Sequence, residues 1–277
     1  TLTTSTNITS NSKNLIIEEE VEKGIVHIQL NRPEKMNSLN MNMFHEISNI
    51  AKKYENQSNI RCIILSGAGK SFCTGLDVNS MIKSPKIAST LLDKPAGTEI
   101  TNLAQDVGYL WRNVKCPVIA VLHGMCLGGG LQIALGADFR ISTPTCKISI
   151  LEAKWGLIPD MSATISLREL IPIDIAKELT MTGRIITGNQ AKEYGLVTKV
   201  DENPYEKALE LAREIKERSP NSVNTTKILY QSTYRNGCTE KEALQLETKY
   251  QTELIGSWNQ IVAAAKNFGI KLPYKND

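Results

Sequence analysis

The sequence predicts an α/β protein whose last third is helical. Up to about residue 202, short apolar segments of strand length alternate with segments of helical spacing, which is typical of a buried sheet covered by helices. After that point only the helical spacing continues. We therefore expect a core domain over residues 14–202 and a helical region over residues 203–277. The Ser-, Thr- and Asn-rich residues 1–13 are expected to form a disordered tail.

Local signals place the individual elements. Strands are expected at 15–20, 25–30, 62–65, 118–122, 139–142 and 147–151. The first two strands are separated by Glu22-Lys23-Gly24, which signals a hairpin. Helices are expected where apolar residues recur at helical spacing, at 40–54, 100–114, 131–137, 205–218, 222–235, 240–256 and 259–267. The polar segment 81–98 shows no clear pattern, and loops of this length are usually functional covers or disordered.

The composition is that of an ordinary globular protein. Of the 277 residues, 41% are hydrophobic and 22% are charged. The net charge of +3 is small and the basic residues are scattered, which argues against nucleic acid as a partner. No apolar run approaches the length of a membrane span, and the six cysteines show no metal-binding spacing. We expect a cytoplasmic protein with buried free thiols, no metal and no membrane partner.

Three consecutive glycines, Gly128 to Gly130, follow an apolar strand and precede a helix-like segment. Because glycine has no side chain to block approach, backbone N–H groups at such a turn can point at a ligand and stabilise a developing negative charge. The spacing matches neither the dinucleotide-binding glycine pattern nor a Walker A loop. The alternative interpretation is a tight turn between a strand and a helix.

A second glycine-containing loop, residues 71–77, follows the strand expected at 62–65. Two backbone amides from two different loops are what an oxyanion hole needs. The alternative is an ordinary turn in which Asp77 caps the segment that follows.

Two carboxylates, Glu152 and Asp160, lie in strongly apolar sequence. Burial raises the pKa of a carboxyl group and makes it a better proton shuttle near neutral pH, and two carboxyls in different environments can divide acid and base roles. The alternatives are an ion pair of Glu152 with Lys154 or Arg140, and a helix cap by Asp160 for residues 162–170.

Together these loops resemble the crotonase superfamily, the enoyl-CoA hydratases and isomerases. The resemblance covers about residues 14–200 and is carried by several motifs in family order. These motifs are residues 31–40, 71–77, 117–130, 137–141, 152–160 and 182–197.

The resemblance implies the ClpP-like crotonase spiral of ββα units followed by a helical trimerisation region. It implies a coenzyme A thioester as substrate, no separate cofactor, and a homotrimer or dimer of trimers. The oxyanion amides would belong to Leu76 and Gly129. The remaining implied substrate-binding positions are Gly75, Asp77, Gly128, Gln132 and the pair Lys35 and Met36, whose loop lies along coenzyme A in relatives.

The chain departs from the hydratase pattern at Gln132. Hydratases of this family use two glutamates, one at this position and one at the position of Glu152. Because an amide cannot take up a proton as a carboxylate does, we expect a double-bond isomerase that uses Glu152 and Asp160 as base and acid. The alternatives are a hydratase in which Gln132 positions the water, and a non-catalytic acyl-CoA-binding homologue.

Overall fold

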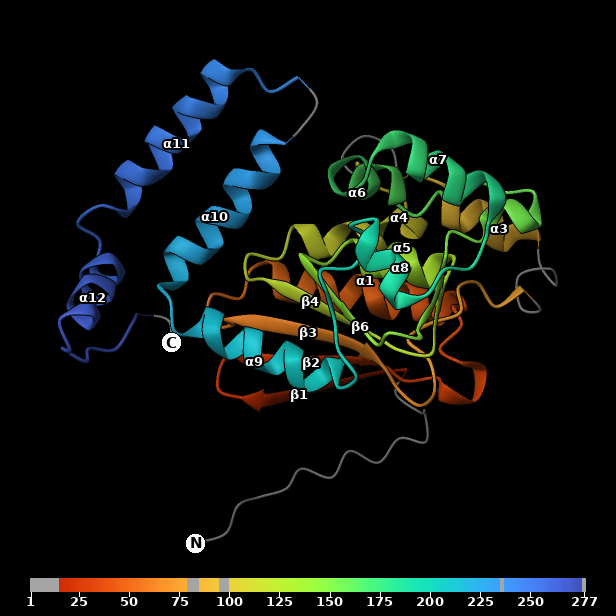
Figure 1. The fold of residues 1–277 in the computed structure, drawn as a ribbon, viewed down its shortest axis with the longest axis horizontal. Helices are drawn as coiled ribbons and strands as arrows, with labels where there is room; N and C mark the ends of the chain where they lie inside the picture. Colours follow the sequence, from red (N-terminus) through yellow and green to blue (C-terminus); the bar gives the residue numbers. More distant parts are fainter. Residues whose placement is uncertain (1–14, 79–84, 95–99, 235–236, 276–277) are drawn as a thin grey trace, which may run out of the picture.

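A computed structural model describes residues 15–78, 85–94, 100–234 and 237–275. Its main sheet has six described strands in the order β1-β2-β3-β4-β6-β8 (Figure 1). β1 and β2 form the predicted antiparallel hairpin, and every later pair in the sheet is parallel. The bounds are β1 (Ile16–Glu22), β2 (Ile25–Leu30), β3 (Cys62–Gly67), β4 (Val118–Leu122), β6 (Phe139–Ser142) and β8 (Lys199–Val200).

A second sheet in the described residues has two strands. It consists of β5 (Met125–Leu127) and β7 (Lys147–Ser149), paired in parallel. β5 follows β4 after only two residues, so the strand before the glycines is not continuous with β4 as the sequence suggested. The strand expected at 147–151 ends at Ser149 because a short 3-10 helix, η3 (Glu152–Trp155), begins soon after it.

The central strands of the main sheet, β3 and β4, are buried on both faces. Ile63 and Leu65 of β3 join the large core cluster, whereas Cys62 and Ile64 join a smaller cluster on the opposite face. This alternation explains why the strands read as continuous apolar runs. The smaller cluster is covered by α9 (Pro204–Lys216), which packs on the sheet.

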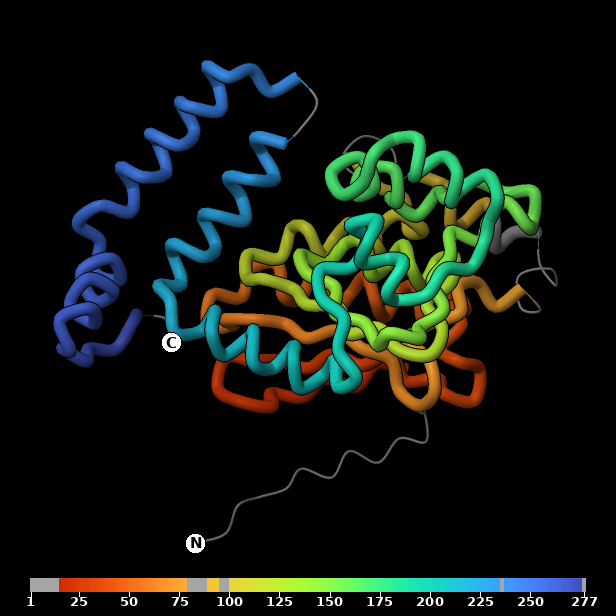
Figure 2. Tube along the Cα trace, viewed as in Figure 1, coloured from red at the N-terminus to blue at the C-terminus, as the bar shows by residue number. Residues whose placement is uncertain are grey.

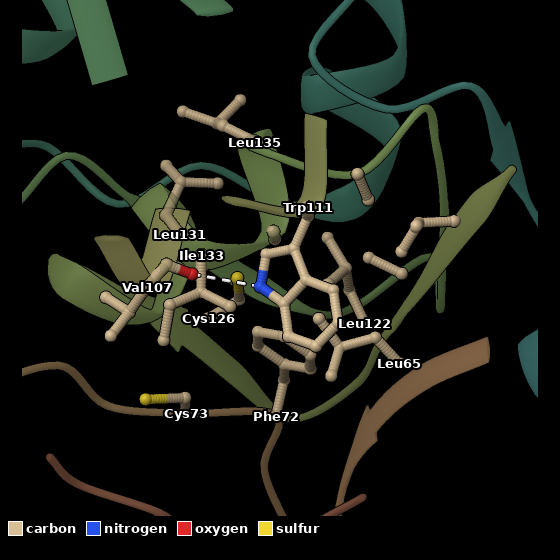
Figure 3. Close-up of a cluster of buried hydrophobic side chains, with 14 of the residues drawn as sticks. Leu65, Phe72, Cys73, Val107, Trp111, Leu122, Cys126, Leu131, Ile133 and Leu135 are labelled. Atoms are coloured by element: carbon tan, nitrogen blue, oxygen red, sulfur yellow. Dashed lines mark hydrogen bonds between the residues drawn. The ribbon is translucent and has the colours of Figure 1, made fainter. Parts of the chain in front are cut away.

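Helices α1 (Met41–Glu55), α4 (Leu103–Tyr109) and α5 (Gly129–Leu135) contribute to the large cluster on the other face. Its centre is Trp111, which is fully buried and donates its indole N–H to the carbonyl oxygen of Val107 at 2.9 Å (Figure 3). The helix expected at 100–114 begins only at Leu103, because Asn102 caps it by accepting from the Gln105 N–H. It ends in the 3-10 turn η2 (Leu110–Arg112).

The remaining helices divide into two groups. One group packs on the core and comprises α3 (Pro85–Leu92), α6 (Ala163–Leu170), α7 (Ile173–Thr182) and α8 (Gly188–Glu193). The other group is the C-terminal arm of α10 (Pro220–Thr233), α11 (Glu240–Leu254) and α12 (Trp258–Asn267). Figures 1 and 2 show this arm extending to one side of the core.

The arm is attached to the core through a buried cation on α10. The ammonium of Lys227 pairs with Asp138 at 2.8 Å and donates to the carbonyl oxygens of Trp111 and Cys116. Burying an ammonium is costly unless it is paired and hydrogen-bonded, as it is here. The root of the arm is therefore fixed to the core by specific contacts.

Two expectations fall wholly or partly outside the described residues. The tail expected at residues 1–13 lies outside them, and of the segment 81–98 the described part contains α3. Among the described residues, no helix has the length and apolar character to cross a membrane. All six cysteines are free, and five of them are buried as expected.

Candidate active site

A cavity of about 400 Å³ lies where the glycine turn, the 71–77 loop and η3 meet. Its apolar lining includes Leu76, Val78, Leu151, Trp155 and Leu157. Thr74, the glycine backbone and Glu152 supply the polar part of the wall. A mostly apolar cavity with few polar groups is the usual form of a small-molecule site.

The glycine turn lies at one wall of the cavity and requires its glycines. Gly128 has φ of +51°, which side chains disfavour, and donates its N–H to Ser149 in the strand next to β5. A methyl group on Gly129 would lie 2.9 Å from the sulfur of Met161. One on Gly130 would lie 2.4 Å from the carbonyl oxygen of Cys73. The turn can therefore adopt its path only without side chains.

The 71–77 loop runs directly alongside this turn. Cys73 exchanges backbone hydrogen bonds with the β5 segment, donating to Met125 and accepting from Leu127. Gly75 has φ of +86°, and a methyl group there would lie 3.2 Å from the nitrogen of Gly129. The two glycine-containing loops that the sequence singled out are thus in contact.

Leu76 is held by its neighbours on both sides. The N–H of Leu39 donates to Gly75 O at 2.8 Å, and the N–H of Asp77 donates to Leu39 O at 2.9 Å. Neither the N–H of Leu76 nor that of Gly129 has an acceptor among the described residues. Both residues line the cavity, so both donors are available to an anionic oxygen.

Two polar side chains from residues 32–38 fasten the loop that carries Leu76. The Asn37 amide donates to three carbonyl oxygens, those of Ala68, Ser71 and Phe72. The Arg32 guanidinium forms an ion pair with Asp77 at 2.7 Å. Asp77 is therefore engaged in holding the loop.

Sequence reasoning missed the positioning roles of Arg32, Asn37 and Leu39. The signal was present, because all three lie in the 31–40 motif that carried the resemblance. Lys35 and Met36 of the same motif are exposed and do not line the cavity. The carbonyl oxygen of Met36 accepts from the N–H of Thr74, which places this segment beside the cavity wall.

Glu152 is the carboxylate in the cavity wall and is 9% exposed. Its Oε1 accepts from the Gln132 amide at 2.6 Å, and its Oε2 is buried with no hydrogen-bond partner among the described residues. Burial raises the pKa of Glu152, the nearby charge of Asp160 raises it further, and the Gln132 hydrogen bond acts in the opposite direction. The ion pair with Lys154 or Arg140 is not formed.

Asp160 lies at the exposed edge of the site and does not line the cavity. Partial desolvation raises the pKa of its carboxyl group. It does not cap α6, whose N-cap residue is Ser162. The structure therefore places Asp160 within electrostatic reach of Glu152 but not in the same wall.

Gln132 lies behind Glu152 and not in the cavity lining. It is 1% exposed, and its amide is bonded to protein groups on both sides. The substrate contact that the sequence suggested for it would require this amide to change partners.

The assembled groups can support proton abstraction next to a carbonyl. Glu152, whose Oε2 has no hydrogen-bond partner among the described residues, lines the same cavity as two residues whose N–H groups can stabilise the resulting oxyanion. In the described part of the chain, no three His, Cys, Asp or Glu side chains cluster as metal ligands would.

Over residues 20–262 the chain matches the family model described as enoyl-CoA hydratase/isomerase. It is 33% identical over 225 residues to an enoyl-CoA hydratase of Mycobacterium tuberculosis, covering 80% of this chain and 82% of that protein. It is 30% identical over 190 residues to the peroxisomal Delta(3,5)-Delta(2,4)-dienoyl-CoA isomerase of Arabidopsis thaliana, covering 67% and 68%. The crystal structure of an enoyl-CoA hydratase from Bacillus anthracis is similar with a TM-score of 0.83 and 29% identity, covering 95% of this chain and 100% of that one.

Proposed function

The chain belongs to the enoyl-CoA hydratase/isomerase family of enzymes and has the crotonase fold, and on that premise we propose that it moves a carbon–carbon double bond along an acyl-CoA thioester. The observation that carries the proposal is that Glu152, whose Oε2 has no hydrogen-bond partner among the described residues, lines one cavity with Leu76 and Gly129. A base and an oxyanion hole on one thioester are what enolate chemistry requires.

The first step is removal of a proton from C2 of a 3-enoyl-CoA by Glu152 Oε2. The electron pair of the broken C–H bond moves into the thioester carbonyl, whose oxygen becomes an enolate oxygen. The N–H groups of Leu76 and Gly129 donate to this oxygen, and losing one such donor typically costs about 3 kcal/mol of barrier. The apolar lining excludes water that would compete for the enolate.

The second step returns a proton further along the chain. In a 3-enoyl substrate the proton goes to C4 and gives the 2-enoyl product, so Glu152 alone can carry it. In a 3,5-dienoyl substrate the proton goes to C6, beyond the carbon from which it came. We assign this delivery to the protonated form of Asp160, which regains a proton from solvent at the exposed edge of the site, while Glu152 releases the proton from C2 to solvent. The place of Asp160 near Glu152 supports the assignment.

The second candidate function is hydration, which the similarity to enoyl-CoA hydratases favours. It requires an activated water and a group that protonates C2. Gln132 has no titratable proton, and its amide is already bonded to Glu152 and to backbone N–H groups. These bonds favour isomerisation over hydration.

The test is a paired ultraviolet assay on the purified chain. One set contains 3-enoyl-CoA and 3,5-dienoyl-CoA, whose isomerisation creates new conjugation, and the other contains 2-enoyl-CoA. We expect absorbance to rise in the first set. Loss of the 2-enoyl absorbance with no change in the first set would establish hydration, and silence in both would support a non-catalytic acyl-CoA-binding role.

We also propose that the chain acts in the cytoplasm as a homotrimer or dimer of trimers, with no cofactor beyond the coenzyme A of its substrate. The free, buried cysteines support a reducing compartment. Exposed apolar side chains on the C-terminal arm, among them Tyr234, Leu244 and Phe268, support an interface there. A monomer by light scattering would contradict the assembly.

A further inference from the structure

Gln132 lies at the junction of three elements. It projects from α5, its amide oxygen accepts from the backbone N–H of Met161 at 2.8 Å and of Ala163 at 3.4 Å, and its amide nitrogen donates to Glu152 at 2.6 Å. These bonds fix the amide orientation. The reversed amide would set an NH₂ group against two N–H donors and an oxygen against a carboxylate.

The start of α6 depends on this arrangement. Its N-cap residue, Ser162, has φ of +74° and its side chain makes no capping bond. The first N–H groups of a helix lack partners within the helix, so an acceptor from elsewhere must replace the missing cap. The Gln132 oxygen is that acceptor. The N–H groups that donate hydrogen bonds to this oxygen also polarise the amide.

We infer that Gln132 is a positioning residue that links the start of α6 to Glu152 and fixes which carboxylate oxygen reacts. This inference rests on the proposed function for its catalytic meaning. Oε1 of Glu152 is occupied by the Gln132 amide, so Oε2 is the carboxylate oxygen left without a hydrogen-bond partner among the described residues. The amide donor also stabilises the anionic form of this carboxyl group, whose pKa burial raises.

The charge environment of Glu152 is simple enough to test this link. Among the described residues, Asp160 is the titratable group whose charge acts on Glu152, and Gln132 is the side chain that donates to it. Glu152 acts as a base in its deprotonated form, so activity falls as pH drops through its pKa. Removing the amide donor must raise that pKa and move the acid limb of the rate profile to higher pH.

The experiment compares Gln132→Met and Gln132→Glu with the wild type. Methionine has similar length but cannot donate, so we expect kcat to fall about tenfold to a hundredfold. KM should stay nearly unchanged, because Gln132 does not line the cavity. Glutamate keeps the acceptor for α6 and can donate only while the two carboxyls share a proton. As pH rises, the activity of Gln132→Glu should therefore pass through a maximum and fall again when the shared proton is lost.

A matched control separates this link from ordinary helix capping. Gln190 of α8 accepts from the Thr187 N–H at 2.9 Å within a capping box and has no contact with Glu152. Gln190→Met should lower thermal stability without moving the pH profile. If Gln132→Met fails to fold, Gln132→Glu alone carries the test, because it retains the acceptor for α6.

A carbon-13 NMR titration of the Glu152 carboxyl group measures the effect of Gln132 on its pKa without any turnover. The Glu152 signal is assigned by its absence in Glu152→Gln. A higher titration midpoint in Gln132→Met supports the inference even if no variant isomerises any substrate, in which case only the proposed function fails. An unchanged midpoint, or an effect confined to KM, would overturn it.

Discussion

The two walls of the cavity are held in place by different means. The amide wall, formed by Leu76 and Gly129, is fixed by backbone hydrogen bonds and by close contacts that only glycine permits. The acid wall, formed by Glu152, is fixed by a single side chain reaching from another helix. The difference teaches that the amide wall can change only where a glycine or a fastening side chain changes. The properties of the acid wall can be changed by one substitution, either at Glu152 or at Gln132 behind it.

The largest expected effect is at the acid wall. Glu152→Gln keeps the shape of the side chain and removes the base, so kcat should fall about 10²- to 10⁴-fold. The measurement is the steady-state rate on 3-enoyl-CoA, with thermal unfolding as a check on folding. If the variant retained more than a tenth of the wild-type kcat, Glu152 would not be the catalytic base.

The amide wall is tested by Gly75→Ala. A methyl group there would lie 3.0 Å from Leu127 O and 3.2 Å from Gly129 N, at a φ of +86°. We expect the loop to shift, the Leu76 donor to be misplaced and kcat to fall about 10²- to 10³-fold. The control is Gly256→Ala, which adds the same methyl group at φ of +75° with no neighbour within 4 Å. If kcat fell equally in both variants, the loss would come from the strain of alanine at a positive φ and not from displacement of the Leu76 N–H.

A smaller loss is expected when the fastening of the amide wall is weakened. Asp77→Asn keeps the shape of the side chain but removes the charge that holds Arg32 at 2.7 Å. Because a neutral amide bonds to Arg32 more weakly than a carboxylate does, we expect kcat to fall about tenfold and the melting temperature to drop modestly. Glu22→Gln removes the exposed ion pair with Arg213 and should change neither quantity measurably. A larger change in KM than in kcat would instead indicate that Asp77 contacts the substrate.

The smallest expected effect on 3-enoyl-CoA comes from Asp160→Asn. Removing this negative charge lowers the pKa of Glu152, so the acid limb of the pH–rate profile should move to lower pH. At neutral pH the 3-enoyl rate should change only a few-fold, whereas the 3,5-dienoyl rate should fall about tenfold or more. Equal losses on both substrates would contradict the assigned role in delivery to C6.

The sequence predicted the main sheet except for the two-residue β8, and its central strands gave the clearest signal because they are buried on both faces. Such strands give unbroken apolar runs, as at 62–65 and 118–122, and nothing else in the chain resembles them. β5 was missed because three residues are too few to show a period. Helix α4 was predicted too early because the cap at Asn102 outweighs the apolar spacing before it.

The candidate site was predictable only as separate motifs. The glycines, Leu76 and Glu152 were recognised because each motif is local in sequence. The bond between Gln132 and Glu152 joins residues twenty positions apart on different elements, so no local pattern reports it. The same is true of the ion pair between Arg32 and Asp77. Contacts of this kind depend on how the loops pack, and only the fold specifies them.

Proton NMR of 3-enoyl-CoA in D₂O, with wild type and Glu152→Gln side by side, tests the central claim most directly. The account predicts that the wild type converts the substrate to 2-enoyl-CoA, with deuterium entering only at positions that the base reaches, and that the variant leaves both the C2 protons and the double bond unchanged. Migration at an undiminished rate in the variant, or a 3-hydroxyacyl-CoA as the product of the wild type, would contradict it.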